Sequence, residues 1–488
     1  MKIHVSRKMG TSIFTSVRKD KLFWIALIFC IIVLGFTIFF RQVFVDGLLI
    51  GGDSYYNLRM AASPLVNYDS LAFENQPVFG ERAWFLLISL APTIFSWFLP
   101  FLLGLLSFAL FYIIMKKIRG ELRFIASILL VISPAFVYLF STSNKYAAAI
   151  LFCLLAVYLF LRKKYNLMIV ALVVSALFSF VIGFIALLAL LFKRSYWRKL
   201  KRQIFVYFLI LLALFSLYYY SFIFTGLQFF YPFEFGFLEI VTRLFTDFGA
   251  FTGFAIFMIL LSIFGIYHVY PYEYKYLAII FIFVFCFIAA IYSLSILFLL
   301  NLLVVYFAAV GLLYFYNYEW RFDLIKSIMM IVLICGLLFS FLSYDEKLLT
   351  SHPSDSMRRA MATISYEPGN VVVISSIENA DFINYAGAKT LVDPRGSYLP
   401  GFEKRVDDIN KLYHYTHVED ITSFMKRYNA TYLWIDKNML DQIWEGEDSG
   451  ILYFFKYGDR MFFESFTSDD VRVLELINKD SFFNATLN

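Results

Sequence analysis

The sequence predicts a polytopic α-helical membrane protein that ends in a C-terminal α/β domain. Of its 488 residues, 61% are hydrophobic and 16% are charged, whereas soluble domains carry about 25% charged residues. Apolar runs of about 18 residues or more, each long enough to cross a bilayer, recur through residues 1–345. After Pro353 charged residues become dense, which indicates that residues 346–488 form a second, exterior domain in contact with water.

About eleven apolar segments are predicted to cross the membrane. The first follows a basic N-terminus and has no small-residue cleavage site, which is typical of a retained helix. The predicted spans are 22–42, 92–115, 124–140, 146–162, 165–178, 179–192, 203–224, 250–268, 276–291, 295–315 and 326–344. The segments at 165–178 and 179–192 are short, so a re-entrant hairpin is an alternative for that pair.

Clusters of basic residues between the spans predict the topology. The strongest clusters lie at 116–123, 162–164 and 193–202, and such clusters mark cytoplasmic loops. We therefore expect a multi-pass protein of the plasma membrane, surrounded by membrane lipids, with a cytoplasmic N-terminus. The first outer loop, about 43–91, and the C-terminal domain are then exterior. The net charge of +6 does not indicate nucleic-acid binding, because the basic residues lie between spans.

The C-terminal domain is predicted to contain strands that alternate with helices. Such alternation predicts a partly parallel sheet. We expect strands at 370–375, 389–393, 430–435, 451–456 and 471–477, and amphipathic helices at 404–413 and 416–428. The sequence contains no Gly-rich phosphate loop, no HExxH zinc motif and no nucleophile elbow.

The segment GGDSYYNLR (51–59) directly follows the first span and is the best indication of chemistry. A transferase that uses a lipid-phosphate-linked sugar must activate an acceptor, neutralise a departing phosphate and hold a glycan. Asp53 supplies a base or a metal ligand. Arg59 supplies a bidentate contact to phosphate oxygens. We therefore predict catalytic roles for Asp53 and Arg59.

Three neighbours in the same segment are candidates for substrate binding. Tyr55 and Tyr56 offer rings for stacking on sugars, and Asn57 offers an amide for hydrogen bonding. The alternative is structural: tyrosines and arginines anchor loops at membrane interfaces, and Asp53 would cap a helix over 54–63.

Two other outer loops contribute candidates for substrate binding. Asn144 and Lys145 lie in the short turn 141–146, and Arg243 and Asp247 lie at the end of loop 225–249. For Lys145 the alternative is a side chain that reaches the membrane interface. For Asp247 the alternative is an N-cap of the eighth span.

Three further charged residues are interpreted as structural. Asp381, Asp393 and Arg395 are predicted to lie at strand or helix ends of the C-terminal domain. Such positions favour turn and capping residues.

The segment GGDSYYNLRMA (51–61) resembles the first aspartate motif of oligosaccharyltransferase catalytic subunits, especially archaeal ones. In that motif an acid is followed by paired aromatics, an amide or His, and an Arg. These enzymes are GT-C glycosyltransferases, which use lipid-phosphate-linked sugars. The order of spans, long outer loop and exterior domain is similar as well. So is the stretch NADFINYAGAKTLVDPRG (379–396), which resembles a segment of the family's exterior domain.

The sequence also departs from that family. Its second motif has acids that help to bind a divalent metal such as Mg or Mn, but residues 141–145 read STSNK. The signature WWDYG is absent, and SSIEN (375–379) stands in its place. The resemblance implies that Asp53 is a metal ligand, whereas the departures favour a mechanism with one aspartate and no metal.

The predicted function is transfer of a sugar or oligosaccharide from a polyprenyl-phosphate-linked donor on the outer membrane face. The acceptor is a glycan, a lipid or a protein. The alternative is a non-catalytic scaffold subunit or a carrier of lipid-linked glycans. The nearly charge-free spans argue against a carrier, and the intact DSYYNLR motif argues against a scaffold.

Overall fold

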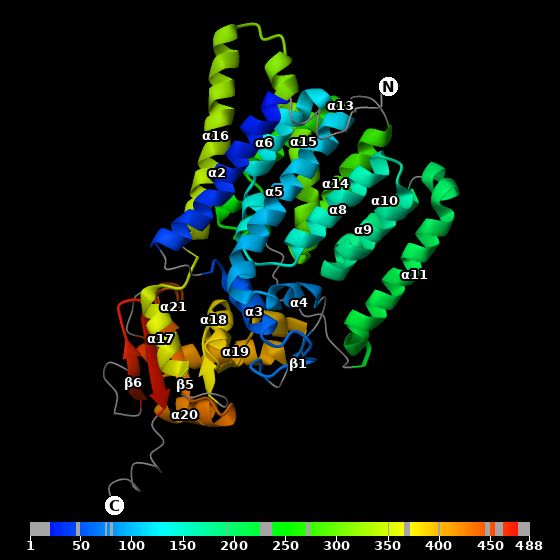
Figure 1. The fold of residues 1–488 in the computed structure, drawn as a ribbon. Helices are drawn as coiled ribbons and strands as arrows, with labels where there is room; N and C mark the ends of the chain where they lie inside the picture. Colours follow the sequence, from blue (N-terminus) through cyan, green and yellow to red (C-terminus); the bar gives the residue numbers. More distant parts are fainter. Residues whose placement is uncertain are drawn as a thin grey trace, which may run out of the picture.

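The structure is a computed structural model with a helical bundle and a C-terminal sheet (Figure 1). The described residues are 20–44, 49–73, 76–78, 82–192, 194–224, 237–269, 274–349, 351–365, 371–398, 401–444, 449–453 and 462–476. The predicted N-terminal basic segment, residues 1–19, lies outside them.

Five described helices are long and apolar enough to cross a membrane. They are α2 (Lys21–Phe44), α5 (Pro92–Ile118), α11 (Arg194–Phe224), α15 (Leu294–Asn317) and α16 (Asp323–Leu349). A sixth span is formed if α6 (Arg123–Val131) and α7 (Pro134–Ser141), which meet at 63°, are counted together. Pro134 cannot continue the hydrogen bonding of α6 and instead starts α7 behind the cap Ser133. The chain is an integral membrane protein.

The remaining predicted spans coincide with shorter apolar helices. These are α8 (Tyr146–Leu161), α9 (Tyr165–Phe178), α10 (Phe180–Phe192), α13 (Ile256–Val269) and α14 (Tyr274–Tyr292). In Figure 1, α8, α9 and α10 lie next to one another at the side of the bundle. The total of eleven spans therefore stays a prediction.

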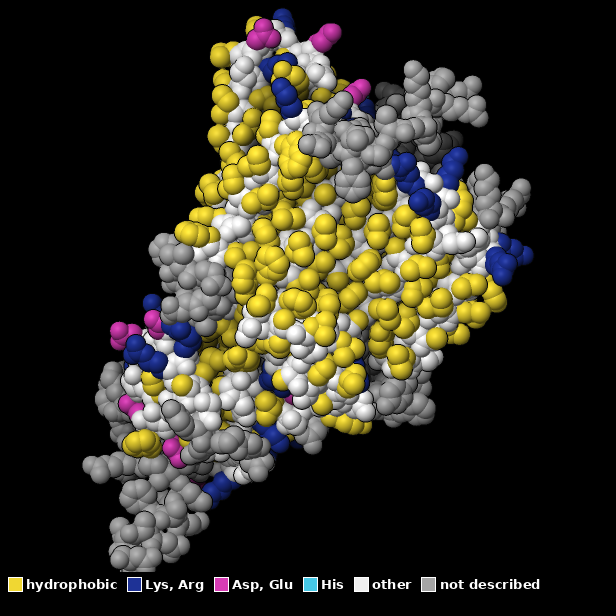
Figure 2. Space-filling model, in the orientation of Figure 1, with side chains coloured by type: hydrophobic (Ala, Val, Ile, Leu, Met, Phe, Trp, Pro, Cys, Tyr) yellow, Lys and Arg dark blue, Asp and Glu magenta, His cyan; other side chains and the backbone are white. Residues whose placement is uncertain are grey.

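The outside of the bundle is apolar. Figure 2 shows hydrophobic side chains over the helical part of one face, with Lys and Arg at the end opposite the C-terminal sheet. Helix α16 exposes residues such as Ile331 and Phe339, as expected of a surface in contact with lipid tails. The positive-inside rule predicts that this basic end is cytoplasmic, and the topology stays a prediction.

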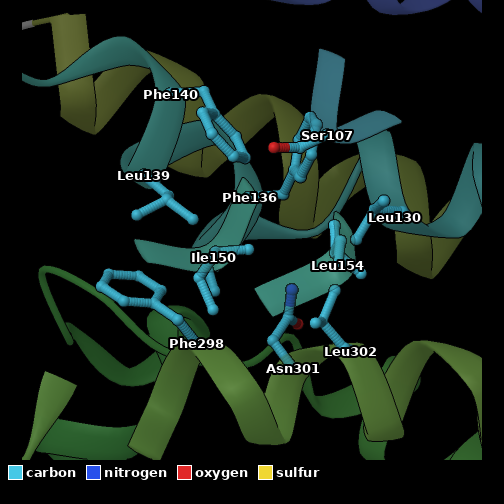
Figure 3. A pocket seen from close by; sticks show the side chains of 11 residues that line it. Ser107, Leu130, Phe136, Leu139, Phe140, Ile150, Leu154, Phe298, Asn301 and Leu302 are labelled. Atoms are coloured by element: carbon cyan, nitrogen blue, oxygen red, sulfur yellow. The ribbon is translucent and has the colours of Figure 1, made fainter. Parts of the chain in front are cut away.

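Inside the bundle, a cavity of about 10 Å³ lies between α5, α6, α7, α8 and α15 (Figure 3). Ser107 Oγ and Asn301 Oδ1 at this cavity have no hydrogen-bond partner within the described part of the chain. Such a volume corresponds to about one water molecule, so the cavity is too small for a lipid or a sugar.

The C-terminal part contains a five-stranded sheet in the order β4-β3-β5-β7-β6. The strands are β3 (Val372–Ile374), β4 (Lys389–Thr390), β5 (Tyr432–Asp436), β6 (Phe462–Thr467) and β7 (Val471–Leu476). Strand β3 is parallel to β4 and β5, while β7 is antiparallel to β5 and β6. Four predicted strands thus coincide with observed ones.

One predicted strand is wrong, and one strand was not predicted. Residues 451–453 are helical, and residues 454–456 lie outside the described part. Ile451 is completely buried, and periodicity alone does not separate a short buried strand from a buried helix segment. Strand β6 reads FFESFT, and its three phenylalanines do not alternate with polar residues as in an easily recognised strand.

Five helices accompany the sheet, and one of them reaches the first outer loop. They are α17 (Asp355–Ser365), α18 (Ala380–Tyr385), α19 (Phe402–Tyr413), α20 (Val418–Arg427) and α21 (Lys437–Ile443). Helix α18 packs against α3 (Gly52–Ala61), where the Tyr55 ring contacts the rings of Phe382 and Tyr385. This contact joins the C-terminal part to the predicted catalytic loop.

Candidate active site

Asp53 lies in the first turn of α3 and does not cap it. The N-cap residue is Gly51, at φ +72°, and the structure has no side-chain hydrogen bond to this helix start. A positive φ of this size favours glycine. The capping alternative for Asp53 is therefore wrong, and its carboxylate is left for other partners.

Those partners come from two distant parts of the chain. Asp53 Oδ1 accepts a hydrogen bond of 2.6 Å from Arg395 Nη2, and Oδ2 accepts one of 3.3 Å from Tyr138 in α7. The Asp53 side chain keeps 44% exposure. The carboxylate is thus oriented by two donors but remains open to a substrate.

Arg395 is held by acids and by an aromatic ring. Its Nη1 donates to Asp381 Oδ1 at 2.5 Å and lies 3.9 Å from Asp393 Oδ1. The guanidinium carbon lies 3.5 Å from the ring centroid of Tyr56, a cation–π contact. Although burial lowers its pKa, the carboxylates of Asp381, Asp53 and Asp393 raise the pKa of Arg395 well above its usual value. Arg395 therefore stays charged.

Asp381 lies in the first turn of α18 and Arg395 in the short helix Pro394–Tyr398, as expected for residues at element ends. Their side chains also pair with one another, and Arg395 extends this pairing to Asp53. Asp393 behaves as a turn residue, since its Oδ1 accepts the backbone N–H of Arg395 at 2.6 Å. Asp381 is buried between α18 and α3, and burial raises its pKa even though Arg395 opposes the shift. The sequence signal for these residues was the resemblance of the stretch 379–396 to a segment of the family's exterior domain.

Arg59 forms its ion pair with Asp69 and not with Asp53. Its Nη1 and Nη2 donate to the two oxygens of Asp69 at 2.6 and 2.5 Å, and the two side chains are 13% and 6% exposed. Burial raises the pKa of Asp69, but the hydrogen bond and charge of Arg59 outweigh it and lower that pKa. The pair ties α3 to β1 (Tyr68–Asp69), so contact between Arg59 and a donor phosphate stays a prediction.

The predicted aromatic residues are buried in protein. Tyr55 is 4% exposed and Tyr56 9% exposed. Burial raises the pKa of Tyr56 to about 12, so that its ring stays neutral beneath Arg395. Their side chains position α3 and Arg395 in this structure, and stacking on a sugar stays a prediction for both.

The structure brings the turn 141–146 against α3, as expected from the topology. Asn57 Nδ2 donates to the carbonyl oxygen of Ser143 at 2.6 Å, and the Ser143 N–H donates to Ser54 Oγ at 3.0 Å. Asn144 holds the turn through Thr142 Oγ1 and through the N–H of Ala147.

Lys145 borders this turn at the start of α8. Its Nζ lies 5.5 Å from the ring centroid of Tyr146. A contact between Lys145 and a lipid phosphate stays a prediction.

The loop before α13 contributes packing to the site. Asp247 Oδ2 accepts the N–H of Ile256 at 2.7 Å, and this residue is the first of α13, so the capping interpretation is correct. Arg243 lies exposed on α12 (Phe237–Leu244), and residues 225–236 lie outside the described part. The segment that follows reaches the site through Phe251. The ring of Phe251 contacts the ring of Tyr138 and lies beside Gly51.

The described residues do not fit the predicted Mg or Mn site. No three His, Cys, Asp or Glu side chains within the described ranges are placed to hold a metal ion. Asp53 and Asp381 both hydrogen bond to Arg395, and the turn at 141–145 offers Lys145 where the family has acids. The charged partner beside Asp53 in this structure is therefore the guanidinium of Arg395.

A larger cavity lies in the C-terminal part, and the residues that line it include those directly before α18. Its volume is about 220 Å³, and it opens beyond the carboxyl ends of β3 and β5. Ser375, Ser376 and Glu378 of the SSIEN segment line it, together with Tyr413 and Asn438. The hydroxyl of Tyr413 is buried and finds no partner among the described residues. The carboxyl ends of parallel strands are where ligands bind in α/β sheets.

The sequence matches no protein-family model and no curated protein. Solved structures do share the fold. The apo oligosaccharyltransferase of Archaeoglobus fulgidus has a TM-score of 0.58 at 13% identity, over 88% of this chain and 71% of that chain. ArnT from Cupriavidus metallidurans, also apo, has a TM-score of 0.50 at 11% identity, over 92% and 97%. The chain has the GT-C fold.

A third GT-C structure shows ligands in this fold. It is AglB from Archaeoglobus fulgidus, in complex with an inhibitory peptide and a dolichol-phosphate. Its TM-score is 0.53 at 11% identity, over 88% of this chain and 70% of that chain. The likeness to all three structures, at 11–13% identity, concerns the fold.

Proposed function

We propose that this GT-C protein is a glycosyltransferase that moves a sugar or oligosaccharide from a polyprenyl-phosphate-linked donor to an acceptor on the outer membrane face. One observation carries the proposal. Asp53 is half exposed where α3, the broken pair α6–α7 and the segment after β4 meet, and two donors orient its carboxylate. Carboxylates held in this way are suited to general base catalysis.

The proposed reaction is a single displacement. The acceptor group loses its proton to Asp53 and bonds to the anomeric carbon of the sugar. The bond between that carbon and the phosphate oxygen breaks, and its electron pair stays on the phosphate. Polyprenyl phosphate leaves with one more negative charge than it had in the donor. Tyr138 keeps Asp53 aligned throughout.

The acceptor is proposed to approach from the side of the C-terminal sheet. The 220 Å³ cavity beside Ser375, Ser376 and Glu378 offers hydroxyl, amide and carboxylate groups for hydrogen bonding. The helix α18 begins directly after these residues and carries Asp381 to α3. An acceptor held in the cavity would therefore contact residues directly before α18, the helix whose Asp381 lies beside α3 and Asp53.

A non-catalytic scaffold is the second candidate, favoured by the poor fit of the site to a metal. Turnover separates the two. Purified protein in lipid is incubated with a panel of radiolabelled polyprenyl-phosphate sugars, beside Asp53→Asn and the helix-cap variant Asp247→Asn as control. Transfer in wild type and Asp247→Asn but not in Asp53→Asn supports an enzyme. Binding of these donors without any turnover in wild type supports the scaffold.

A further inference from the structure

The guanidinium of Arg395 is the centre of charge in the site, and the hydrogen bonds it makes to described residues do not use all of its donors. Its side-chain hydrogen bonds go to Asp53 and Asp381. A guanidinium has more N–H donors than these two bonds consume. The Arg395 side chain is 25% exposed, and it is paired with Asp53, whose side chain is 44% exposed.

We propose that Arg395 binds the phosphate of the lipid-linked donor and stabilises the charge that develops on it, in place of a divalent metal ion. This inference rests on the proposed function and names the group that the metal-free reaction needs. Arg is suited to the role because its planar fork matches phosphate oxygens.

The surroundings fix the orientation of this guanidinium. Asp381 holds Nη1 from the side of α18, Asp393 lies 3.9 Å away, and the Tyr56 ring covers one face of the plane. Stabilisation by preorganised groups requires no rearrangement during the reaction. Arg395 thus arrives in the site already aligned, as a bound metal would be.

The charges balance during the reaction. Asp53 takes up the acceptor's proton and becomes neutral, so its ion pair with Arg395 weakens. In the same step the phosphate gains a negative charge. Arg395 can therefore exchange one anionic partner for another without a change in its own charge.

Three carboxylates around one guanidinium would repel a phosphate if all stayed ionised. Two features reduce this repulsion. Burial raises the pKa of Asp381, so this acid takes up a proton more readily than an exposed one. The ion pair of Arg59 and Asp69 is neutral as a whole, and its guanidinium carbon lies 5.4 Å from the ring centroid of Tyr56.

Donor kinetics test the proposal with Arg395→Gln, Arg395→Lys and the control Arg358→Gln. Arg358 lies on α17 and pairs with Asp355. Loss of one preorganised donor group typically lowers kcat by about 100-fold or more, which we expect for Arg395→Gln. Arg395→Lys keeps the charge without the fork, so a smaller loss is expected, and Arg358→Gln should equal wild type. Wild type should keep its rate in EDTA.

Full rates in Arg395→Gln, or a wild-type rate abolished by EDTA and restored by Mg²⁺ or Mn²⁺, would overturn the proposal. Binding of sugar-free polyprenyl phosphate to the full-length protein in nanodiscs is a second readout that does not depend on turnover. We expect Arg395→Gln to weaken this binding at least tenfold. Unchanged binding in that variant contradicts the role of Arg395, whereas absent turnover with intact, Arg395-dependent binding contradicts only the transfer function.

Arg395→Lys controls for a loss of folding. It retains a cation that can pair with the buried carboxylate of Asp381 on α18. If Arg395→Gln fails to fold, the comparison of Arg395→Lys with wild type decides. If Arg395→Lys has the phosphate affinity and the kcat of wild type, the proposal is wrong. If both values fall while the thermal stability is unchanged, the proposal is supported.

Discussion

Asp53 Oδ1 and Arg395 Nη2 lie 2.6 Å apart although 342 residues separate them in the chain. One comes from the first outer loop and the other from the segment after β4. The C-terminal part of the chain therefore contributes directly to the proposed catalytic site.

Tyr138→Phe should slow transfer without changing donor affinity. The Tyr138 hydroxyl donates to Asp53 Oδ2 at 3.3 Å, a long hydrogen bond. Hydrogen bonds to charged groups contribute about 1.5–3 kcal/mol, and the long distance favours the lower end. We expect kcat to fall about tenfold and the KM for the donor to stay within about twofold. An unchanged kcat would show that Arg395 alone orients Asp53.

Asp69→Asn should destabilise the first outer loop more than any change at an exposed acid. It leaves Arg59 buried without its charged partner, and breaking such a pair costs about 3–5 kcal/mol. Thermal unfolding followed by tryptophan fluorescence measures the loss. Replacement of both residues, as in Arg59→Met with Asp69→Leu, should recover much of the stability because no charge is then left unpaired. A single variant as stable as wild type would contradict this account.

The same ion pair predicts a dependence of stability on acid pH. Arg59 lowers the pKa of Asp69 below its ordinary value of 3.8. An acid with a lowered pKa contributes stability that is present above its unfolded pKa and is lost as pH falls through the folded one. The difference in thermal stability between wild type and Asp69→Asn should therefore be constant from pH 7 to about pH 5 and shrink below about pH 4. If the difference in thermal stability grew as the pH fell, the predicted direction of the pH dependence would be wrong.

Gly52→Ala should lower activity while leaving the helical bundle folded. A Cβ at position 52 would lie 2.9 Å from Asp381 Oδ2 and 3.1 Å from Asp381 Cβ. Asp381 would have to move, and Arg395 with it, because the two share a hydrogen bond. We expect a loss of transfer by at least about tenfold, since small displacements of catalytic groups are costly. Gly249→Ala is unsuitable as a control. A Cβ at position 249 would meet no atom within 4 Å, but the φ of Gly249 is +109°, which strains any other residue. Gly120→Ala, with its nearest atom at 3.8 Å, should keep full activity.

The sequence was sufficient for the membrane helices and for the position of Asp53. Hydrophobic runs and basic clusters are local signals, and the predicted spans fall on apolar helices, except that 124–140 is divided between α6 and α7. The motif around Asp53 is also local, and the topology correctly brought the turn 141–146 to it.

The partners of these residues could not be predicted in the same way. Arg395 and Asp381 meet α3 only because β3, β4 and α18 bring them there, and a sequence pattern contains no such distance. The assignment of Arg59 to phosphate overlooked Asp69, ten residues away, because the hairpin of β1 with β2 (Gln76–Pro77) that places it has strands of two residues each. Asp247 was expected to cap the helix that follows it, and it accepts the N–H of Ile256, nine residues further along the chain.

The central claim is that Asp53 takes part in cleaving the bond between sugar and lipid phosphate. Mass spectrometry of the lipid after a single turnover in proteoliposomes tests it most directly. We predict one polyprenyl phosphate for each sugar transferred by wild type, and no polyprenyl phosphate above background with Asp53→Asn. Cleavage by Asp53→Asn at the wild-type rate, or donor that crosses the bilayer intact in the wild type, would contradict the account.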